Sequence, residues 1–323
     1  MTRSKDSSQP LDDEPALPIS EEAEEQWQKW KAFSLDAYAR YQDTIEQIRR
    51  RHPGLTSYDI VERIDGTHGT FAWWWAAASE MRETINSLNA WAVRLHEWQA
   101  WNGMLSSYDD EEDKWEVLHH FLEPVAFYCM LQPSSFADRL ALTAENMLHQ
   151  ANQRTSPDEP DRLAQDERPG KHLSRSDRRK QLGKLGKRWS KFKAFQQALH
   201  ALDSDEYSRL TRNYRNLASH SFSPRLMLGH ISRATRSIGP SIDMVLQDDG
   251  RYRRTEHPTK RAVTYAMGSQ DPLSLAEIYK ANLAEYQRAK KAIECFIVLV
   301  EELCDAIDQK DAGAKPAVND PAP

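Results

Sequence analysis

The sequence predicts a mainly α-helical bundle, with a small β-hairpin inserted toward its C-terminal end and an additional helical unit at its N-terminal end. Apolar residues recur at helical spacing through most of the 323 residues. Only 12 glycines are present, so few of these segments are interrupted. The period changes between residues 243 and 267, around the turn Asp248-Asp249-Gly250, which favours a hairpin at that point.

Two long helices are expected first. Residues 1–19 are polar, acidic and proline-bearing, and we expect them to be disordered. Ser20 and the two acids that follow it open a helix that ends near Arg51, before His52-Pro53-Gly54. The second helix is expected from about Thr70 to Asn102. The predicted apolar stripes are Trp27, Trp30, Ala37, Tyr41, Ile45 and Ile48 in the first helix, and Phe71, Trp74, Ala78, Ile85, Leu88, Ala92, Leu95 and Trp98 in the second.

Prolines divide the next part of the chain. Helices are expected at 111–122, 125–132 and 135–152, separated by Pro124 and Pro133. We assign residues 20–132 to an N-terminal helical region and residues 133–310 to a second domain. Residues 311–323 are expected to be disordered, as residues 1–19 are.

The second domain is expected to contain a mobile basic linker at 153–186, which opens with three prolines and many charges. Shorter elements follow it: helices at 187–202, 204–223 and 225–236, and strands at 243–247, 251–255 and 262–267. The capping box Ser274-x-x-Glu277 then opens a long last helix that continues to about residue 310.

The segment Arg215-Asn216-Leu217-Ala218-Ser219-His220 carries the clearest chemical signal. A guanidinium can hold a phosphate and stabilise charge that develops on it, and an imidazole can move protons near neutral pH. The same spacing occurs from Arg63 to His68, across Gly66, and from Arg225 to His230, directly after Pro224. The segment from Arg215 to His220 differs from these two pairs because it lies in an expected amphipathic helix. That helix is opened by Asp203-x-x-Glu206 and stopped by Pro224.

On that helix, the expected apolar stripe consists of Tyr207, Leu210, Tyr214, Leu217 and Ala218. Arg215 and His220 lie about 140° apart, with about 7.5 Å of rise between them, so one helix does not bring them together. Two copies of the helix related by a two-fold axis would bring the arginine of one copy and the histidine of the other together.

This arginine, asparagine and histidine pattern resembles the catalytic motif of the HEPN superfamily. The resemblance covers about Ser134 to Gln309, and the N-terminal region has no such resemblance. It implies a HEPN-like helical bundle, a homodimer whose two motifs share a cleft, and metal-independent endoribonuclease activity carried by Arg215, Asn216 and His220. It also implies a role as a toxin or an anti-phage defence effector, with an antitoxin or another defence protein as a partner. The sequence departs from many toxin-type members at Phe222, where they carry tyrosine.

Two other functions remain open. A HEPN-like helical protein could bind RNA, a nucleotide or a protein partner without cleaving anything. An all-α scaffold with no nucleic-acid role is the third alternative, favoured by a structure in which Arg215 and His220 lie far from any dimer cleft.

Basic residues near the motif are expected to contact RNA phosphates. The net charge of −6 argues against a protein that coats nucleic acid, but residues 171–193 are strongly basic. The expected RNA contacts are Arg178, Arg179, Lys184, Lys187 and Arg188 in this run, and Arg209, Arg212 and Ser219 on the motif helix. A solvated linker explains the basic run equally well.

Other classes of site find little support. Cys129, Cys295 and Cys304 form no CxxC pair and are expected to be buried thiols of a cytoplasmic protein. His96, Glu116 and the adjacent His119-His120 lack metal-ligand spacing, so no metal or cofactor is expected. The tryptophans, including Trp73-Trp74-Trp75, are expected to serve as core and interface anchors. No signal peptide, membrane span or membrane partner is expected.

Overall fold

The computed structural model describes residues 20–51, 54–156, 158, 160–167 and 173–313. It is mainly helical, with one two-stranded antiparallel sheet, as the sequence predicts. The long helices are α1 (Glu21–Arg51), α3 (Ala78–Leu105), α5 (Glu123–Thr155) and α10 (Leu275–Gly313). The shorter elements are α2 (Asp59–Asp65), α4 (Glu111–Val117), α6 (Arg175–Gly186), α7 (Phe192–His200), α8 (Asp205–Leu210), α9 (Tyr214–His220), the π-helical turns η1 (Trp73–Ala77) and η2 (Leu118–Leu122), and the 3-10 turn η3 (Ala164–Glu167).

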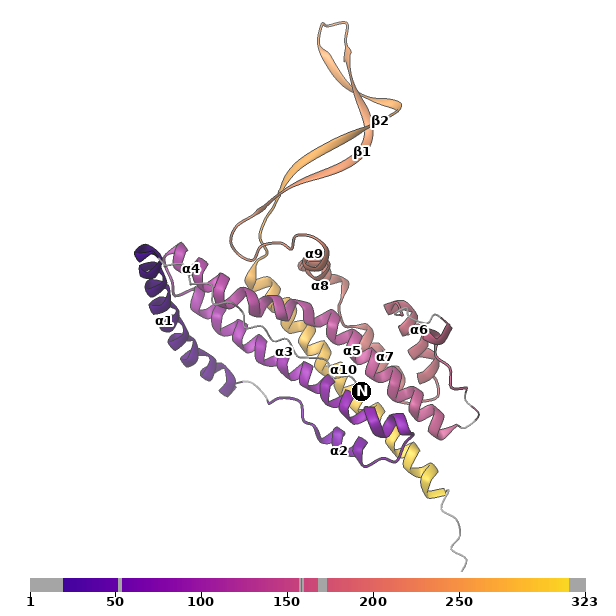
Figure 1. The fold of residues 1–323 in the computed structure, drawn as a ribbon. Helices are drawn as coiled ribbons and strands as arrows, with labels where there is room; N and C mark the ends of the chain where they lie inside the picture. The colour runs from indigo at the N-terminus through magenta and orange to yellow at the C-terminus, as the bar shows by residue number, and fades with distance from the viewer. Residues whose placement is uncertain (1–19, 52–53, 157, 159, 168–172, 314–323) are drawn as a thin grey trace, which may run out of the picture.

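Helices α3, α5 and α10 pack against one another as the centre of the bundle (Figure 1). Helix α1 covers α3, α6 lies against α5, and α7 lies mainly against α10. Buried residues from both predicted domains belong to one hydrophobic cluster. The disorder predicted for residues 1–19 and for 314–323 lies outside the described residues, and α10 continues to Gly313, beyond the predicted start of the tail.

The predicted helix breaks at Pro124 and Pro133 are wrong, because α5 is continuous from Glu123 to Thr155. Pro124 occupies the first turn, where no helical N–H is required, and Pro133 lies inside the helix. Since Pro133 has no N–H, it leaves the carbonyl of Cys129, four residues earlier, without its helical partner. Asn282 Nδ2 of α10 donates to that carbonyl at 2.8 Å. A side chain of the neighbouring helix α10 therefore supplies the hydrogen bond that the Cys129 carbonyl lacks within α5.

Asn282 is fully buried and links four helices. Its amide oxygen accepts from Trp91 Nε1 of α3 at 2.9 Å, and its Nδ2 also donates to the Tyr207 hydroxyl of α8 at 2.8 Å. The Tyr207 hydroxyl donates in turn to the Met130 carbonyl of α5 at 3.2 Å. Because buried polar groups are costly when unpaired, this network fixes α8 against the core.

The start of the second predicted helix is shifted by the π turn η1. Phe71 and Trp74, which were expected on the apolar stripe, are exposed together with Trp75, and Trp73 is buried instead. A π turn adds one residue to the helix and so rotates the preceding residues by about 100°. From Ala78 onward the predicted stripe is buried, as expected. In α1, Ala37, Tyr41 and Ile45 are buried, but Trp27 and Trp30 are exposed, contrary to the prediction.

The mobile linker predicted at 153–186 is wrong over its last third, where a helix is found; residues 157, 159 and 168–172 of the linker lie outside the described residues. Helix α6 occupies Arg175–Gly186, with Gln181 and Leu182 buried. Gly186 is in close contact with the Phe192 ring, since a Cβ on Gly186 would lie 2.1 Å from a ring carbon. Helix α6 is therefore packed onto the bundle.

The predicted hairpin is present and much longer than expected. Strand β1 (Ile231–Leu246) pairs with β2 (Tyr252–Gln270) around the predicted turn, and the two together are called the arm here. The short helix predicted at 225–236 is wrong, because β1 begins at Ile231, and the predicted third strand at 262–267 is part of β2. The arm projects away from one end of the bundle (Figure 1). None of the helices in the described part of the chain combines the length and the apolar character of a membrane span.

Candidate functional site

The motif lies in a short helix, α9, that is separate from α8. The continuous helix predicted at 204–223 is wrong, because Arg212 and Asn213 adopt left-handed backbone conformations with φ of 50° and 55°. Asn213 N donates to the Ser208 carbonyl at 2.7 Å and closes the turn. Asparagine tolerates the left-handed region better than most residues do. The interruption lets α9 take its own direction after α8.

Helix α8 is held in place from α10. The fully buried carboxylate of Glu285 accepts from Asp203 N at 3.0 Å and from Ser204 Oγ at 2.6 Å. Arg288 Nη1 donates to the same carboxylate at 2.6 Å. A negative charge at the N-terminus of a helix is favourable, so this carboxylate both neutralises and orients the start of α8.

Helix α9 is anchored through Tyr214. The Tyr214 ring is buried and meets the ring of Phe127, on α5, edge to face at 6.1 Å. Burial raises the pKa of the Tyr214 phenol, while a hydrogen bond with Ser223 acts in the opposite direction. Leu217 and Ala218 are half-buried, but Leu210, which the sequence places on the same stripe, is 45% exposed on the separate helix α8. The predicted stripe is therefore only partly correct.

The polar face of α9 is open to solvent. Arg215, Asn216, Ser219 and His220 are all exposed. Both Arg215 and His220 lie within the same uninterrupted seven-residue helix, so the angular separation expected from helix geometry applies to them. His220 is the last residue of the helix.

Arg215 has an acidic neighbour on α5. Its Nη2 lies 3.9 Å from Asp138 Oδ2, and both side chains are about half exposed. Asp138 is also held by Arg175, whose Nε and Nη2 reach Oδ1 at 2.8 Å and Oδ2 at 2.9 Å. Hydrogen bonding to Asp138, and then to Asp203, raises the pKa of Arg175. Asp138 thus has Arg175 as its close partner and Arg215 as its distant one.

The other expected RNA contacts on this part of the chain have mixed surroundings. Arg209 Nε donates to the Asp205 carbonyl at 3.4 Å, a contact within its own helix. Arg212 Nη1 donates to the Asp271 carbonyl, which ties the turn before α9 to the segment before α10. Ser219 is exposed beside His220.

The expected contacts in the basic run divide into two groups. Arg178 Nη1 is 3.0 Å from Glu145 Oε1, and the Glu145 side chain is only 1% exposed, so Arg178 neutralises a buried carboxylate. Arg188 donates to Ser156 Oγ and lies over the Trp189 ring at 5.1 Å. Arg179 is half-buried, and Lys184 and Lys187 are exposed. Arg178 thus forms one group by itself. The second group, Arg179, Lys184, Lys187 and Arg188, has no such buried carboxylate partner in the described structure.

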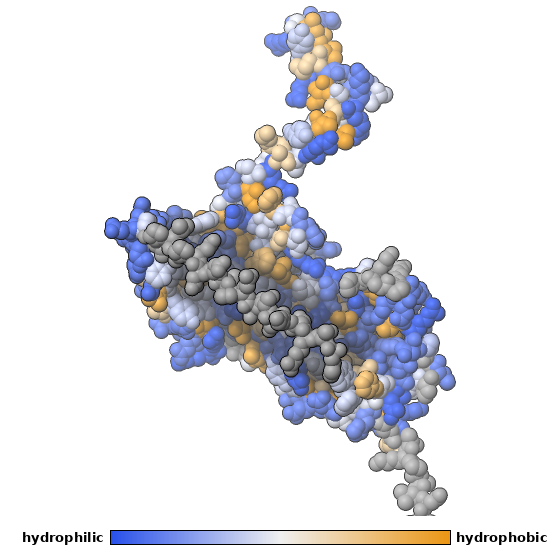
Figure 2. Space-filling model, viewed as in Figure 1, coloured by the Kyte–Doolittle hydropathy of each residue, from blue (hydrophilic) through white to orange (hydrophobic). Residues whose placement is uncertain are grey.

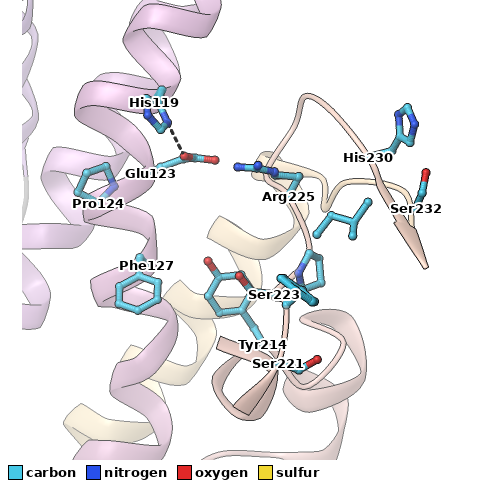
Figure 3. A pocket seen from close by; sticks show the side chains of 13 residues that line it. His119, Glu123, Pro124, Phe127, Tyr214, Ser221, Ser223, Arg225, His230 and Ser232 are labelled. Carbon is cyan, nitrogen blue, oxygen red and sulfur yellow. Dashed lines mark hydrogen bonds and ion pairs between the residues drawn. The ribbon is translucent and has the colours of Figure 1, made fainter. Parts of the chain in front are cut away.

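An open cleft beside α9 was not predicted from the sequence. It has a volume of about 720 Å³ and lies between the start of α5, the residues after α9 and the base of the arm (Figure 3). Its ionisable lining comprises His119, Glu123, Tyr214, Arg225 and His230. His119 Nδ1 is 3.1 Å from Glu123 Oε2, and Arg225 points toward Glu123 from the opposite wall.

The one signal for this cleft was the second arginine and histidine pair. Arg225 and His230 have the spacing of Arg215 and His220, but they follow Pro224 and end beside Gly229, which argues against a helix. Here they lie in the extended connection to β1 and not on a helix. Among the residues that the structure describes, no group of three His, Cys, Asp or Glu side chains could hold a metal ion.

Comparison with known proteins gives no relative. No protein-family model, no curated protein and no solved structure matches this chain.

Proposed function

We propose that this protein is a metal-independent endoribonuclease of the HEPN type, built on a HEPN-like bundle and acting in toxin-antitoxin or anti-phage defence. The observation that carries the proposal is that Arg215, Asn216 and His220 all occupy the exposed face of α9. The neighbouring cleft of about 720 Å³ is lined by Tyr214 of the same helix and by none of these three side chains. A charged face without apolar cover suits an anionic substrate. The basic side chains of Arg179, Lys184 and Lys187 on and after α6 extend the positive surface.

The proposed reaction uses the substrate's own 2′-hydroxyl. The 2′-oxygen attacks the adjacent phosphorus, the bond from phosphorus to the 5′-oxygen breaks, and the products carry a 2′,3′-cyclic phosphate and a 5′-hydroxyl. His220 accepts the proton of the attacking 2′-hydroxyl and delivers a proton to the leaving 5′-oxygen. Arg215 stabilises the charge on the pentavalent phosphate, and Asn216 orients the phosphate or the imidazole.

Two copies are required for this assignment. Arg215 and His220 are about 140° apart around one helix, so a single α9 presents them in different directions. A two-fold axis beside α9 would place the Arg215 of each copy near the His220 of the other. The second candidate, a protein that binds RNA or a partner without cleavage, shares these surfaces and differs only in the absence of turnover.

The test is incubation of purified protein with total RNA in the presence of a chelator, followed by gel electrophoresis and end analysis. We expect cleavage in the wild type, 5′-hydroxyl product ends, and loss of cleavage in Arg215→Ala and His220→Ala. Arg225→Ala and His230→Ala provide a matched control, because this pair has the same spacing but lines the cleft, which Arg215 and His220 do not. Loss of cleavage in the control pair with activity retained in the α9 variants would assign the chemistry to Arg225 and His230 instead.

A further inference from the structure

The arm exposes an apolar face that nothing in the described chain covers. Along β1 the even-numbered residues share one face, and their partners on β2 lie on the same face. Its exposed apolar members include Ile238, Ile242, Met244 and Leu246 of β1, and Val263 and Met267 of β2. Tyr252 and Tyr265 lie on the same face, together with the charged residues Arg236, Arg254, Glu256 and Arg261. Met267 is 89% exposed. Figure 2 shows apolar patches along the arm.

The opposite face of the arm is polar over most of its length. It carries Arg233, Thr235, Ser237 and Asp243 on β1, and Ser237 Oγ lies 2.9 Å from Thr264 Oγ1 across the strands. The arm is thus an amphipathic ribbon of two strands. An isolated two-stranded hairpin is marginal in water and gains stability by packing its apolar face. The pattern of side chains therefore points to a partner on that face.

The base of the arm directs it away from its own bundle. Met227 N donates to the Leu273 carbonyl at 2.9 Å, and Leu273 N donates to the Arg225 carbonyl at 2.8 Å. The side chains of Leu226 and Leu273 are buried beneath this clamp. With both connections held in this way, the arm extends beyond the bundle instead of lying back on it (Figure 1).

We propose that the apolar face of the arm docks on a second copy of this chain, so that two copies exchange arms. Charge favours this occupant. Residues 231–270 contain seven Lys or Arg and four Asp or Glu, which gives +3, whereas the whole chain carries −6 and the remainder therefore −9. The remainder includes the five consecutive acids Asp109 to Asp113. The positively charged arm of one copy is therefore complementary in charge to the acidic bundle of another copy.

The available area also favours exchange between two copies. A ribbon of 16 residues is roughly 50 Å long and two strands are roughly 10 Å wide, so one face covers on the order of 500 Å². Counting both sides, a single docked arm buries roughly 1,000 Å², at the lower limit of stable interfaces. Two exchanged arms bury roughly 2,000 Å², which is sufficient for a stable dimer.

RNA is the alternative occupant of the arm. Surfaces that bind single strands combine aromatic rings with positive charge, and this face carries Tyr252, Tyr265 and three arginines. Its aliphatic side chains nevertheless outnumber the two rings, which favours docking on protein. The inference does not depend on RNA cleavage, because arm exchange needs only two copies of the chain.

The test is sedimentation of the full chain at micromolar concentration. We expect a dimer for the wild type and a monomer for Ile238→Glu/Met244→Glu, with dimerisation weakened by at least about 100-fold, since two apolar contacts are lost and two charges face an apolar surface. Thr235→Glu/Ser241→Glu is the matched control: it adds the same charges to the same strand at the same spacing, but on the polar face. It should remain dimeric.

A second variant guards against misfolding of the arm. Arg233 and Gly268 face each other across the strands, so a two-residue Asn-Gly turn can join them and remove residues 234–267. This variant should be monomeric, with helical circular dichroism retained. A monomeric wild type, a dimeric deletion variant, or equal loss of dimer in both charge variants would overturn the proposal. Altered RNA binding with unchanged sedimentation would point to RNA as the occupant.

Discussion

Arg215 Nη2 lies 3.9 Å from Asp138 Oδ2, although both oxygens of that carboxylate already accept hydrogen bonds from Arg175. The geometry differs between the two arginines: Arg175 is held bidentately, whereas Arg215 makes one long contact. Bidentate pairs are the stronger and more directional ones. Arg215 is therefore weakly restrained near α5, and its guanidinium can reach a phosphate without first breaking a strong ion pair.

The geometry of the Arg215 guanidinium should matter as well as its charge. We predict that Arg215→Lys lowers the rate of RNA cleavage by at least about 10-fold, because lysine keeps the charge but cannot hold a phosphate through two parallel hydrogen bonds. Its thermal midpoint should stay close to that of the wild type, since Arg215 is half exposed. Single-turnover cleavage assays measure the effect, and wild-type rates in Arg215→Lys would reduce the role of Arg215 to general attraction.

Arg178 should be essential for stability, unlike its neighbour in the sequence. We predict that Arg178→Ala destabilises the fold by about 3 kcal/mol, because it leaves the buried Glu145 carboxylate without its cation. Arg179→Ala is the control and should change stability by less than about 1 kcal/mol. Urea unfolding followed by circular dichroism compares the two. Equal stability of both variants would mean that Glu145 is adequately stabilised by other groups.

The exposed basic side chains should contribute phosphate contacts that do not depend on base sequence. Replacing Arg179, Lys184 and Lys187 by glutamine, with Arg178 left intact, should weaken RNA binding across unrelated sequences. For a single strand, each lost contact should reduce the slope of log K against log salt by about 0.7. Fluorescence anisotropy titrations at several salt concentrations provide the slopes. An unchanged slope would mean that these three residues make no phosphate contacts, and that such contacts come from Arg209, Arg212 and Arg215.

Alkaline pH should loosen the contact between α1 and α3. Burial, followed by the charge of Glu97, raises the pKa of Tyr41 to about 12, and the Tyr41 ring stacks on Trp101 at 4.4 Å. Since an unfolded tyrosine ionises near pH 10, this stabilisation is complete below about pH 10 and is lost as the pH rises toward 12. Tyr41→Phe should shift alkaline unfolding, followed by absorbance and circular dichroism, to higher pH. An identical alkaline transition in Tyr41→Phe would assign it to other groups.

The predictable parts of the fold were those with a repeating local signal. The apolar period from Ala78 to Trp98 and the capping box at Ser274 correctly locate α3 and α10, and the turn at Asp248 locates the hairpin. The errors came from long-range compensation. Asn282, 149 positions after Pro133 in the sequence, supplies the hydrogen bond that keeps α5 continuous, and no local pattern reveals this.

The sequence predicted the exposure of Arg215, Asn216 and His220 on a helix face, but not what surrounds them. Arg215, Asn216 and His220 are on the polar face of a helix, as expected from the amphipathic pattern. The break at Arg212 and Asn213 was missed because neither glycine nor proline marks it. The cleft was missed because its walls come from two segments that lie far apart in the sequence, 119–127 and 214–232. Arg178 was misjudged because its buried partner Glu145 lies 33 residues away.

The π turn η2 has a consequence for the length of the chain in this region. A π turn contains one residue more than the α-helical turn that it replaces. Deleting one residue from Leu118–Leu122 would let α4 and α5 merge into a regular helix, and would turn Trp115 by about 100° relative to Glu123. The wall of the cleft would then present different side chains. In evolutionary terms, a one-residue gap at this position in a related sequence would mark a protein whose cleft wall is lined by different side chains.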